Sequence, residues 1–251
     1  MKTFSAPASS SVRNPSDHAY CDRRTAPVPA WKRALDILGC LAALPFLAVT
    51  TLFAAVLIRT ASPGPIFFLQ ERVGYRGRRF KLYKFRTMHV TADVTTHQTH
   101  FAELVRSNVA MQKLDSQGDR RLVPGGWLLR ASGLDELPQI INVLRGEMSL
   151  VGPRPCIPYE YEQYSLAQRE RFSTVPGLTG LWQVSGKNRT TFDEMIRLDI
   201  HYAKNRSLGS DVKIMLQTLP ALWVQISDTR KAKAEGAARA KELVSASALS
   251  A

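Results

Sequence analysis

An uninterrupted apolar run near the N-terminus is the feature that most constrains the fold. No charged residue lies between Ile37 and Ile58, and Arg59 ends the run. About 20 consecutive apolar residues form a helix long enough to cross the hydrocarbon core of a bilayer. The alternative is a buried helix of a soluble protein, which also tolerates such a run. We expect residues 31–61 to form a membrane-embedded helix, preceded by a disordered tail over residues 1–30.

Basic residues flank this run on both sides and bear on its topology. They are Arg23, Arg24, Lys32 and Arg33 before it and Arg72, Arg76, Arg78, Arg79, Lys81, Lys84 and Arg86 after it. Positive charge resists translocation, so both flanks favour the cytoplasm. A re-entrant helix that enters and leaves by the same face satisfies both flanks, with Pro45 as the break because proline removes a helix hydrogen bond. A straight span is the second topology.

The charge of the chain limits the classes of partner that it suits. The net charge is +13, which fits nucleic acid, anionic lipid or phosphorylated substrates. The three cysteines are scattered without zinc or disulfide spacing, so we expect reduced thiols. His89, His97 and His100 match no standard metal site, so we expect exposed loop histidines, and we assign no role to residues 89–124.

Two adjacent carboxylates, Asp135 and Glu136, form the most informative local pattern. Pro138 is tolerated only in the first turn of a helix, so a helix that ends at Gly146 places both carboxylates in its first turn. Unpaired N–H groups there favour negative charge. The spacing of Ser132 and Asp135 also fits a capping box. On this fragment alone, capping is the better-supported interpretation.

Several other segments of the chain favour phosphate chemistry. Residues 66–70 predict a short strand, and residues 80–88 alternate apolar with basic side chains, which predicts a half-buried strand with one cationic face. Arg154 lies between two prolines, and such a stiff loop orients an arginine for fork-like binding of phosphate. Residues 159–172 predict a polar helix, residues 175–189 a glycine-punctuated loop and strand, and residues 192–200 and 211–226 amphipathic or apolar helices.

The chain resembles the bacterial sugar transferases, the monotopic phosphoglycosyl transferases, from about residue 32 to about residue 221. The matching motifs, in order, are SPGP at 62–65, QERVG at 70–74, YKFRTM at 83–88, LDELPQ at 134–139, NVLRG at 142–146, MSLVGPRP at 148–155 and PGLTG at 176–180. The resemblance implies a mixed α/β, helix-rich fold of the short catalytic-core form. It comprises the membrane helix, a small cytoplasmic catalytic domain over residues 62–227 with amphipathic membrane-surface helices, and a flexible tail over residues 228–251.

The family resemblance also implies a reaction. A sugar 1-phosphate passes from a nucleotide diphosphosugar, a UDP-sugar in most of the family, to polyprenyl (undecaprenyl) phosphate at the bacterial inner membrane. This transfer is the first membrane step of exopolysaccharide or other glycoconjugate assembly. It implies that Asp135 is the nucleophile, that Glu136 binds Mg²⁺, and that Arg130 and Arg154 bind phosphate, with Lys84 and Gln183 as further candidates. A carboxylate is chemically able to accept a phosphoryl group in this way.

The sequence departs from the family at the helix break. Members usually carry a Ser-Pro pair midway along the re-entrant helix, whereas here Leu44 precedes Pro45 and the break lies about one turn early. A non-enzymatic, membrane-tethered basic module that binds nucleic acid or anionic lipid is the alternative function. No motif of a nucleic-acid fold supports it, so we expect no nucleic-acid partner. The sequence leaves the sugar, the pathway and the oligomeric state open.

Overall fold

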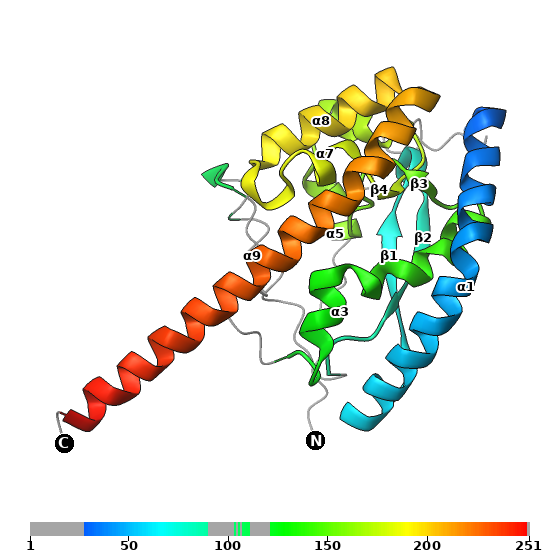
Figure 1. Ribbon diagram of the computed structural model, residues 1–251. Helices are drawn as coiled ribbons and strands as arrows, with labels where there is room; N and C mark the ends of the chain where they lie inside the picture. Colours follow the sequence, from blue (N-terminus) through cyan, green and yellow to red (C-terminus); the bar gives the residue numbers. More distant parts are fainter. Residues whose placement is uncertain (1–27, 90–102, 104, 106, 111–120, 250–251) are drawn as a thin grey trace, which may run out of the picture.

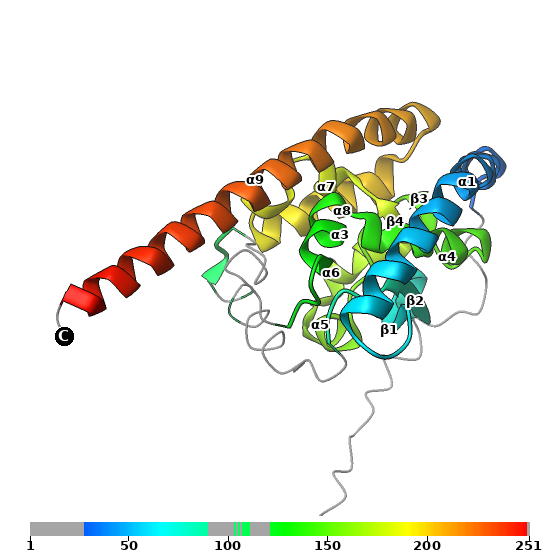
Figure 2. The same ribbon diagram turned by 60° about the horizontal axis from the view of Figure 1, so that its bottom comes forward.

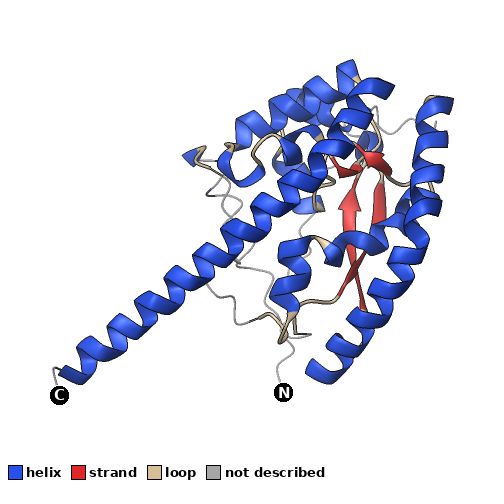
Figure 3. Cartoon of the chain, in the orientation of Figure 1, coloured by secondary structure: helices blue, strands red, loops and turns tan. Residues whose placement is uncertain are grey.

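The computed structural model describes residues 28–89, 103, 105, 107–110 and 121–249. Nearly all of the predicted N-terminal tail, together with His97 and His100, lies outside these residues. The described part is helix-rich, with many helices around two small sheets, as predicted (Figure 3).

Helix α1 (Ala30–Ala61) contains the apolar run and follows one side of the body (Figures 1 and 2). Of the described helices, it is the one with the length and apolar composition to cross a membrane. Its exposed face carries large apolar side chains, among them Leu38, Val49, Leu52 and Val56. Such a continuous apolar surface is unusual in water and suits lipid.

Pro45, the predicted bending point of a re-entrant helix, lies inside α1. The structure has one helix of 32 residues that continues through Pro45, and in Figure 1 it bends without reversing direction. The hydroxyls of Thr50 and Thr51 both donate to the carbonyl of Leu47, at 3.0 and 2.7 Å. A proline removes only one helix hydrogen bond, so the remaining bonds on either side carry the helix through the bend. Whether the helix is re-entrant or spanning stays a prediction.

The other face of α1 packs against the body along most of its length. Cys40 joins a buried cluster with Leu82 of β2, and Ile58 joins another with Phe85. Next to Cys40, Gly39 faces Leu150 so closely that an added Cβ would lie 2.5 Å from its Cδ1. The helix is therefore part of the domain and does not stand apart from it as a tether.

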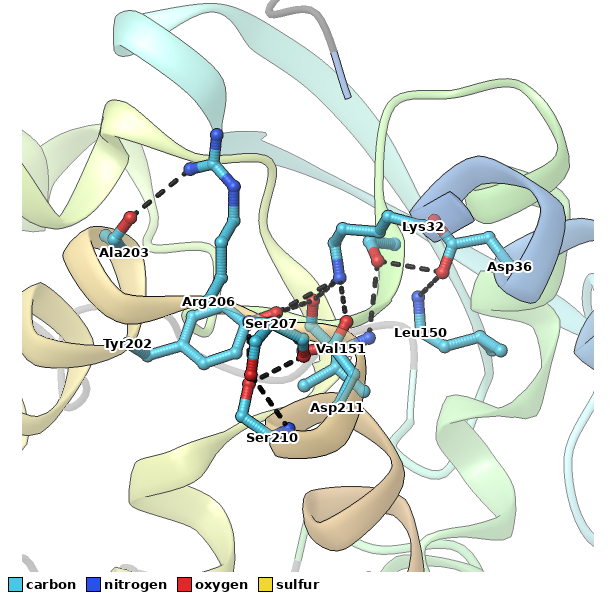
Figure 4. A network of polar contacts seen from close by, with 11 residues as sticks. Lys32, Asp36, Leu150, Val151, Tyr202, Ala203, Arg206, Ser207, Ser210 and Asp211 are labelled. Carbon is cyan, nitrogen blue, oxygen red and sulfur yellow. Dashed lines mark hydrogen bonds and ion pairs between the residues drawn. The ribbon is translucent and has the colours of Figure 1, made fainter. Parts of the chain in front are cut away.

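A buried network fixes the N-terminal end of α1 (Figure 4). The Lys32 ammonium lies 2.6 Å from the Asp211 carboxylate and donates to the Val151 carbonyl at 2.9 Å. Tyr202 donates to the same two residues. Asp36 accepts from the hydroxyl of Ser149 at 2.8 Å. Lys32 thus serves as a buried ion-pair partner as well as a flanking positive charge.

The two sheets each have two strands. β1 (Phe67–Val73) pairs antiparallel with β2 (Arg79–Phe85), and the short 3₁₀ turn η2 (Tyr75–Gly77) joins them. β3 (Ser149–Val151) pairs in parallel with β4 (Gly177–Thr179). The strands predicted over residues 66–70 and 80–88 correspond to β1 and β2.

The carboxylate motif lies between two helices. α3 (Gly126–Ser132) ends at Gly133, whose φ of 72° is the left-handed conformation that glycine adopts readily. The 3₁₀ helix η4 (Leu134–Gln139) and α4 (Ile140–Leu144) follow, and Gly146 has a φ of 76° just after the predicted helix end. The predicted capping box is wrong, because the Ser132 hydroxyl donates to the Leu128 carbonyl within α3.

The C-terminal half consists mainly of helices. They are α5 (Pro158–Gln163), α6 (Leu166–Arg169), η5 (Glu170–Ser173), α7 (Leu181–Val184), η6 (Lys187–Arg189), α8 (Phe192–Asn205) and α9 (Leu208–Leu249). The polar helix predicted over 159–172 is divided into three because Ser165 caps a new helix by accepting from Gln168. α8 confirms the helix predicted over 192–200. α9 contains the helix predicted over 211–226 and continues beyond the predicted domain end at 227 (Figure 1).

Candidate active site

Strand β2 and helix η4 bring the first two site residues together. Leu82 and Lys84 lie on one face of β2, and Leu82 is buried against Ile140 in the core. Lys84 therefore reaches across to η4, where its Nζ lies 2.9 Å from Oε1 of Glu136. The prediction of a single cationic face is wrong, because Lys84 shares its face with Leu82 whereas Arg79 and Lys81 lie on the other.

Arg154 approaches the same carboxylate from the loop after β3. Its Nη2 lies 3.0 Å from Oε1 of Glu136, and its Nη1 lies 3.4 Å from Oε2. The fork-like geometry that the stiff loop predicted is present, with a carboxylate as the partner. Lys84, Glu136 and Arg154 thus form a cluster, which we call the cation clamp.

Charge and burial together set the protonation of the cation clamp. Burial lowers the pKa of Lys84 to about 8, against the attraction of Glu136, which acts to raise it. Burial acts to raise the pKa of Glu136, but the positive charges of Arg154, Lys84 and Lys187 outweigh it and hold that pKa well below its usual range. Glu136 is therefore ionised at neutral pH, and the pKa of Lys84, at about 8, lies close to neutral pH.

Asp135 lies beside the cation clamp in the first turn of η4, as predicted. Its side chain is largely buried, with the residue 7% exposed. The negative charge of Asp135 acts to raise the pKa of both Lys84 and Arg154, so it lies within their electrostatic reach. The site therefore holds two carboxylates and at least two cations, all of them partly or largely buried.

The other two predicted site residues are Arg130 and Gln183, which lie in α3 and α7. Arg130 in α3 donates to the Thr87 hydroxyl at 3.4 Å, and its carbonyl accepts from Gln225 of α9. Gln183 in α7 donates from Nε2 to the Leu178 carbonyl at 3.2 Å. Its Oε1 is buried and has no hydrogen-bond partner among the described residues. The contacts of Arg130 and Gln183 do not test the roles predicted for them.

Two cations belong to the site although sequence analysis did not single them out. Arg72 of β1 donates to the Pro155 carbonyl at 3.2 Å, and its charge acts to lower the pKa of Lys84. Lys187 of η6 contributes to the low pKa of Glu136 and donates to Gln225 at 2.7 Å. Both lie in segments that the sequence marked as basic or glycine-punctuated. Only the fold shows that these segments reach Glu136.

Carboxylate oxygens are the type of ligand that Mg²⁺ binds, so this site can hold the ion if the substrate supplies the other ligands. Among the described residues, no cluster of three or more His, Cys, Asp or Glu side chains is placed to hold a metal ion. Mg²⁺ is usually held by one or two carboxylates together with substrate phosphates. Oε2 of Glu136 accepts only the longer Arg154 bond among the described contacts, so this oxygen has room to accept a metal ion.

Comparison with known proteins identifies sequence relatives over the same region. A family model described as bacterial sugar transferase matches residues 28–225. The galactosyl transferase CpsE of Streptococcus agalactiae is 43% identical over 75% of the chain and 41% of its own length. The exopolysaccharide production protein ExoY of Sinorhizobium fredii is 40% identical over 76% of the chain and 84% of its own length.

A third relative has a name that states its reaction. The UDP-glucose:undecaprenyl-phosphate glucose-1-phosphate transferase of Caulobacter vibrioides is 40% identical over 76% of the chain and 69% of its own length. The chain thus spans less than half of CpsE and most of the other two relatives.

Proposed function

The chain belongs to the bacterial sugar transferase family, and from this membership we propose that it transfers a sugar 1-phosphate from a UDP-sugar to undecaprenyl phosphate. The observation that carries the proposal is the Asp135–Glu136 pair, in which Glu136 is held by the cation clamp. The cations neutralise Glu136, and Asp135 beside it is the proposed nucleophile. The clamp cations also reduce the cost of placing a diphosphate beside two negative charges.

The proposed reaction has two steps at one phosphorus atom. A carboxylate oxygen of Asp135 attacks the phosphorus that bears the sugar, and the bond from that phosphorus to the UMP oxygen breaks. UMP leaves, and the sugar phosphate remains on Asp135 as an acyl phosphate. An oxygen of undecaprenyl phosphate then attacks the same phosphorus. The acyl phosphate bond breaks, the carboxylate is regenerated, and undecaprenyl diphosphosugar is released.

The residues of the chain divide this work between them. Arg154 and Lys84 are placed to bind the phosphates as the charge moves from the diphosphate to the leaving UMP. Arg130 and Gln183 remain proposed substrate contacts. Magnesium, held by Glu136 and the substrate phosphates, would neutralise the diphosphate when bound.

We also propose that the enzyme acts at the cytoplasmic face of the bacterial inner membrane. The exposed apolar face of α1 and the lipid nature of the acceptor support this location. The charge of +13 suits the anionic surface of that leaflet. The names of two relatives include galactose and glucose, so the assay below uses a panel of sugars.

The test is to trap the intermediate in the absence of the acceptor. The purified full-length protein is mixed with a UDP-sugar and quenched in acid, and peptide mass spectrometry looks for one sugar phosphate on Asp135. UMP release is measured with UDP-galactose, UDP-glucose and their N-acetylated forms. We expect one equivalent of UMP per enzyme without acceptor and turnover with undecaprenyl phosphate. Turnover without labelling of Asp135, or with undiminished labelling in Asp135→Asn, would contradict the covalent route. A protein that releases no UMP from any donor with the acceptor present would contradict the function.

A further inference from the structure

The loop that carries Arg154 is held by its backbone carbonyls at four successive residues. The carbonyls of Pro153, Arg154, Pro155 and Cys156 accept from Gly177 N at 2.9 Å, Arg171 Nη2 at 3.1 Å, Arg72 Nη1 at 3.2 Å and Val73 N at 2.8 Å, respectively. Pro153 and Pro155 have no N–H, so the loop depends on its carbonyls for anchoring. The donor to the Arg154 carbonyl is the side chain of Arg171, which lies 17 residues further along the chain and is not part of the cation clamp.

Arg171 is itself held rigidly within the core. It is 2% exposed, and its partner Asp199 in α8 is 1% exposed. The Nη2 of Arg171 donates both to the Asp199 carboxylate and to the Arg154 carbonyl. Its Nη1 donates to the Tyr164 hydroxyl at 3.0 Å. A buried arginine with these three acceptors has little freedom to move, so it provides a fixed reference point behind the loop.

The carbonyl that Arg171 holds controls the direction of the Arg154 side chain. Pro155 already restricts the backbone of Arg154 to extended conformations. The bond from Arg171 fixes the carbonyl and so the remaining backbone torsion of Arg154. The direction in which the Arg154 side chain leaves the backbone is then fixed, and from there its Nη2 reaches Oε1 of Glu136 at 3.0 Å. Arg171 acts on the opposite end of the residue from Glu136.

We infer that Arg171, kept in place by Asp199, is a positioning residue that aims Arg154 at Glu136 and at the substrate phosphate. This inference rests on the proposed function, because Arg154 is a phosphate contact only in that reaction. An ion pair that merely holds α8 against η5 is the competing explanation. The two explanations differ in whether the effect of changing Arg171 depends on Arg154.

The test is a double-mutant cycle on kcat/KM for UMP release with undecaprenyl phosphate present. Arg171→Lys keeps the charge but loses the planar fork that serves several acceptors. We expect it to lower kcat/KM by about tenfold in the otherwise unchanged enzyme. In the Arg154→Lys background, we expect the same change to lower kcat/KM by less than about twofold, because the side chain that it aims is already absent. A loss of about tenfold in both backgrounds would overturn the inference.

Arg86→Lys is the matched control for a buried arginine. Arg86 is also buried and donates to the carbonyls of Ser62 and Pro63, which belong to another loop. We expect Arg86→Lys to lower kcat/KM by the same factor with or without Arg154→Lys, so that the two fold-changes multiply in the double variant.

A second variant separates positioning from stability if Arg171→Lys unfolds. Arg171→Met combined with Asp199→Leu replaces the ion pair by apolar groups, which often restores stability. We expect this double variant to recover Tm while its kcat/KM stays about tenfold low. Recovery of both would overturn the inference. If the enzyme without any substitution released no UMP, the proposed function itself would have failed.

Discussion

Arg154 and Glu136 face each other as two forks, with 3.0 Å between Nη2 and Oε1 and 3.4 Å between Nη1 and Oε2. Lys84 shares Oε1 of the same carboxylate. One negative charge therefore holds two cations that come from different parts of the chain. The relationship makes Glu136 the electrostatic centre of the site and Asp135 its neighbour.

Glu136→Gln should leave both cations without their shared counter-charge. We expect a loss of about 10²-fold in kcat, because the cations that must bind the diphosphate are no longer held in place. The amide has nearly the same shape, so the core beneath η4 should remain intact. UMP release and circular dichroism check the two parts of this prediction. Glu147→Gln, in the turn between α4 and β3, is the control for a carboxylate that contacts Asn142. Near-normal turnover in Glu136→Gln would contradict the central role of this carboxylate.

The acid stability of the protein should depend on the same residue. The pKa of Glu136 in the folded state lies well below its usual range, so its stabilising contribution is fully present above about pH 4.3, the ordinary pKa of glutamate. The contribution is lost as the pH falls through the folded-state pKa. We therefore expect Tm to fall more steeply below about pH 4.3 in the unchanged protein than in Glu136→Gln. Parallel curves of Tm against pH would contradict the low pKa.

The pH profile of activity should report Lys84. With a pKa of about 8, Lys84 is charged below that pH and loses its proton above it. We expect kcat/KM to fall on the alkaline side of about pH 8, because the neutral amine no longer attracts phosphate. Arginine stays protonated throughout this range. The alkaline decrease should therefore disappear in Lys84→Arg, whatever its absolute activity. An identical alkaline limb in the variant would assign the titration to another group.

The buried pair of Lys32 and Asp211 should contribute strongly to stability. Both side chains are almost fully buried and 2.6 Å apart, so Asp211→Asn leaves an unpaired ammonium in the core. Removing one partner of such a pair costs about 3–5 kcal/mol. The exposed pair of Lys204 and Glu170, at 2.7 Å, is the control, since Glu170→Gln should change stability by no more than about 1 kcal/mol. Thermal unfolding of the detergent-solubilised protein measures both. Equal shifts in Tm would contradict the difference in burial.

Gly177 should be irreplaceable where β4 meets the Arg154 loop. A Cβ there would lie 2.0 Å from the Gly152 nitrogen and 2.4 Å from the Thr179 carbonyl oxygen. Because both contacts are backbone, Gly177→Ala must separate β3 from β4, and we expect it to lower Tm and activity together. Gly209→Ala is the control, because it has open space and lies in α9, where alanine should stabilise by about 0.5–1 kcal/mol. An unchanged Tm in Gly177→Ala would contradict the close approach of these strands.

The sequence predicted the elements of the site better than their contacts. Asp135 and Glu136 were recognisable because Pro138 and Gly146 are local signals for the start and end of a helical segment. Lys84 and Arg154 were recognisable as cations on a strand and a stiff loop. That both meet the same carboxylate depends on how β2, η4 and the β3 loop pack, which no local pattern encodes.

Two further outcomes show where local signals do not suffice. Arg171 lies in a stretch that predicted a polar helix, yet its guanidinium is buried against Asp199, 28 residues away. Proline at position 45 signals a break, yet α1 continues because the hydrogen bonds on either side persist. At Arg171, tertiary packing outweighs a local preference.

The attachment of α1 at both ends has a mechanical consequence. Lys32 holds one end to Asp211, and Leu57 packs against Gly125 near the other. In the proposed membrane-bound enzyme, the catalytic residues therefore keep a constant position relative to the membrane helix. A domain joined to its helix by a flexible linker would not. The rigid attachment of α1 therefore fixes the depth, relative to the bilayer, at which the active site meets the acceptor phosphate.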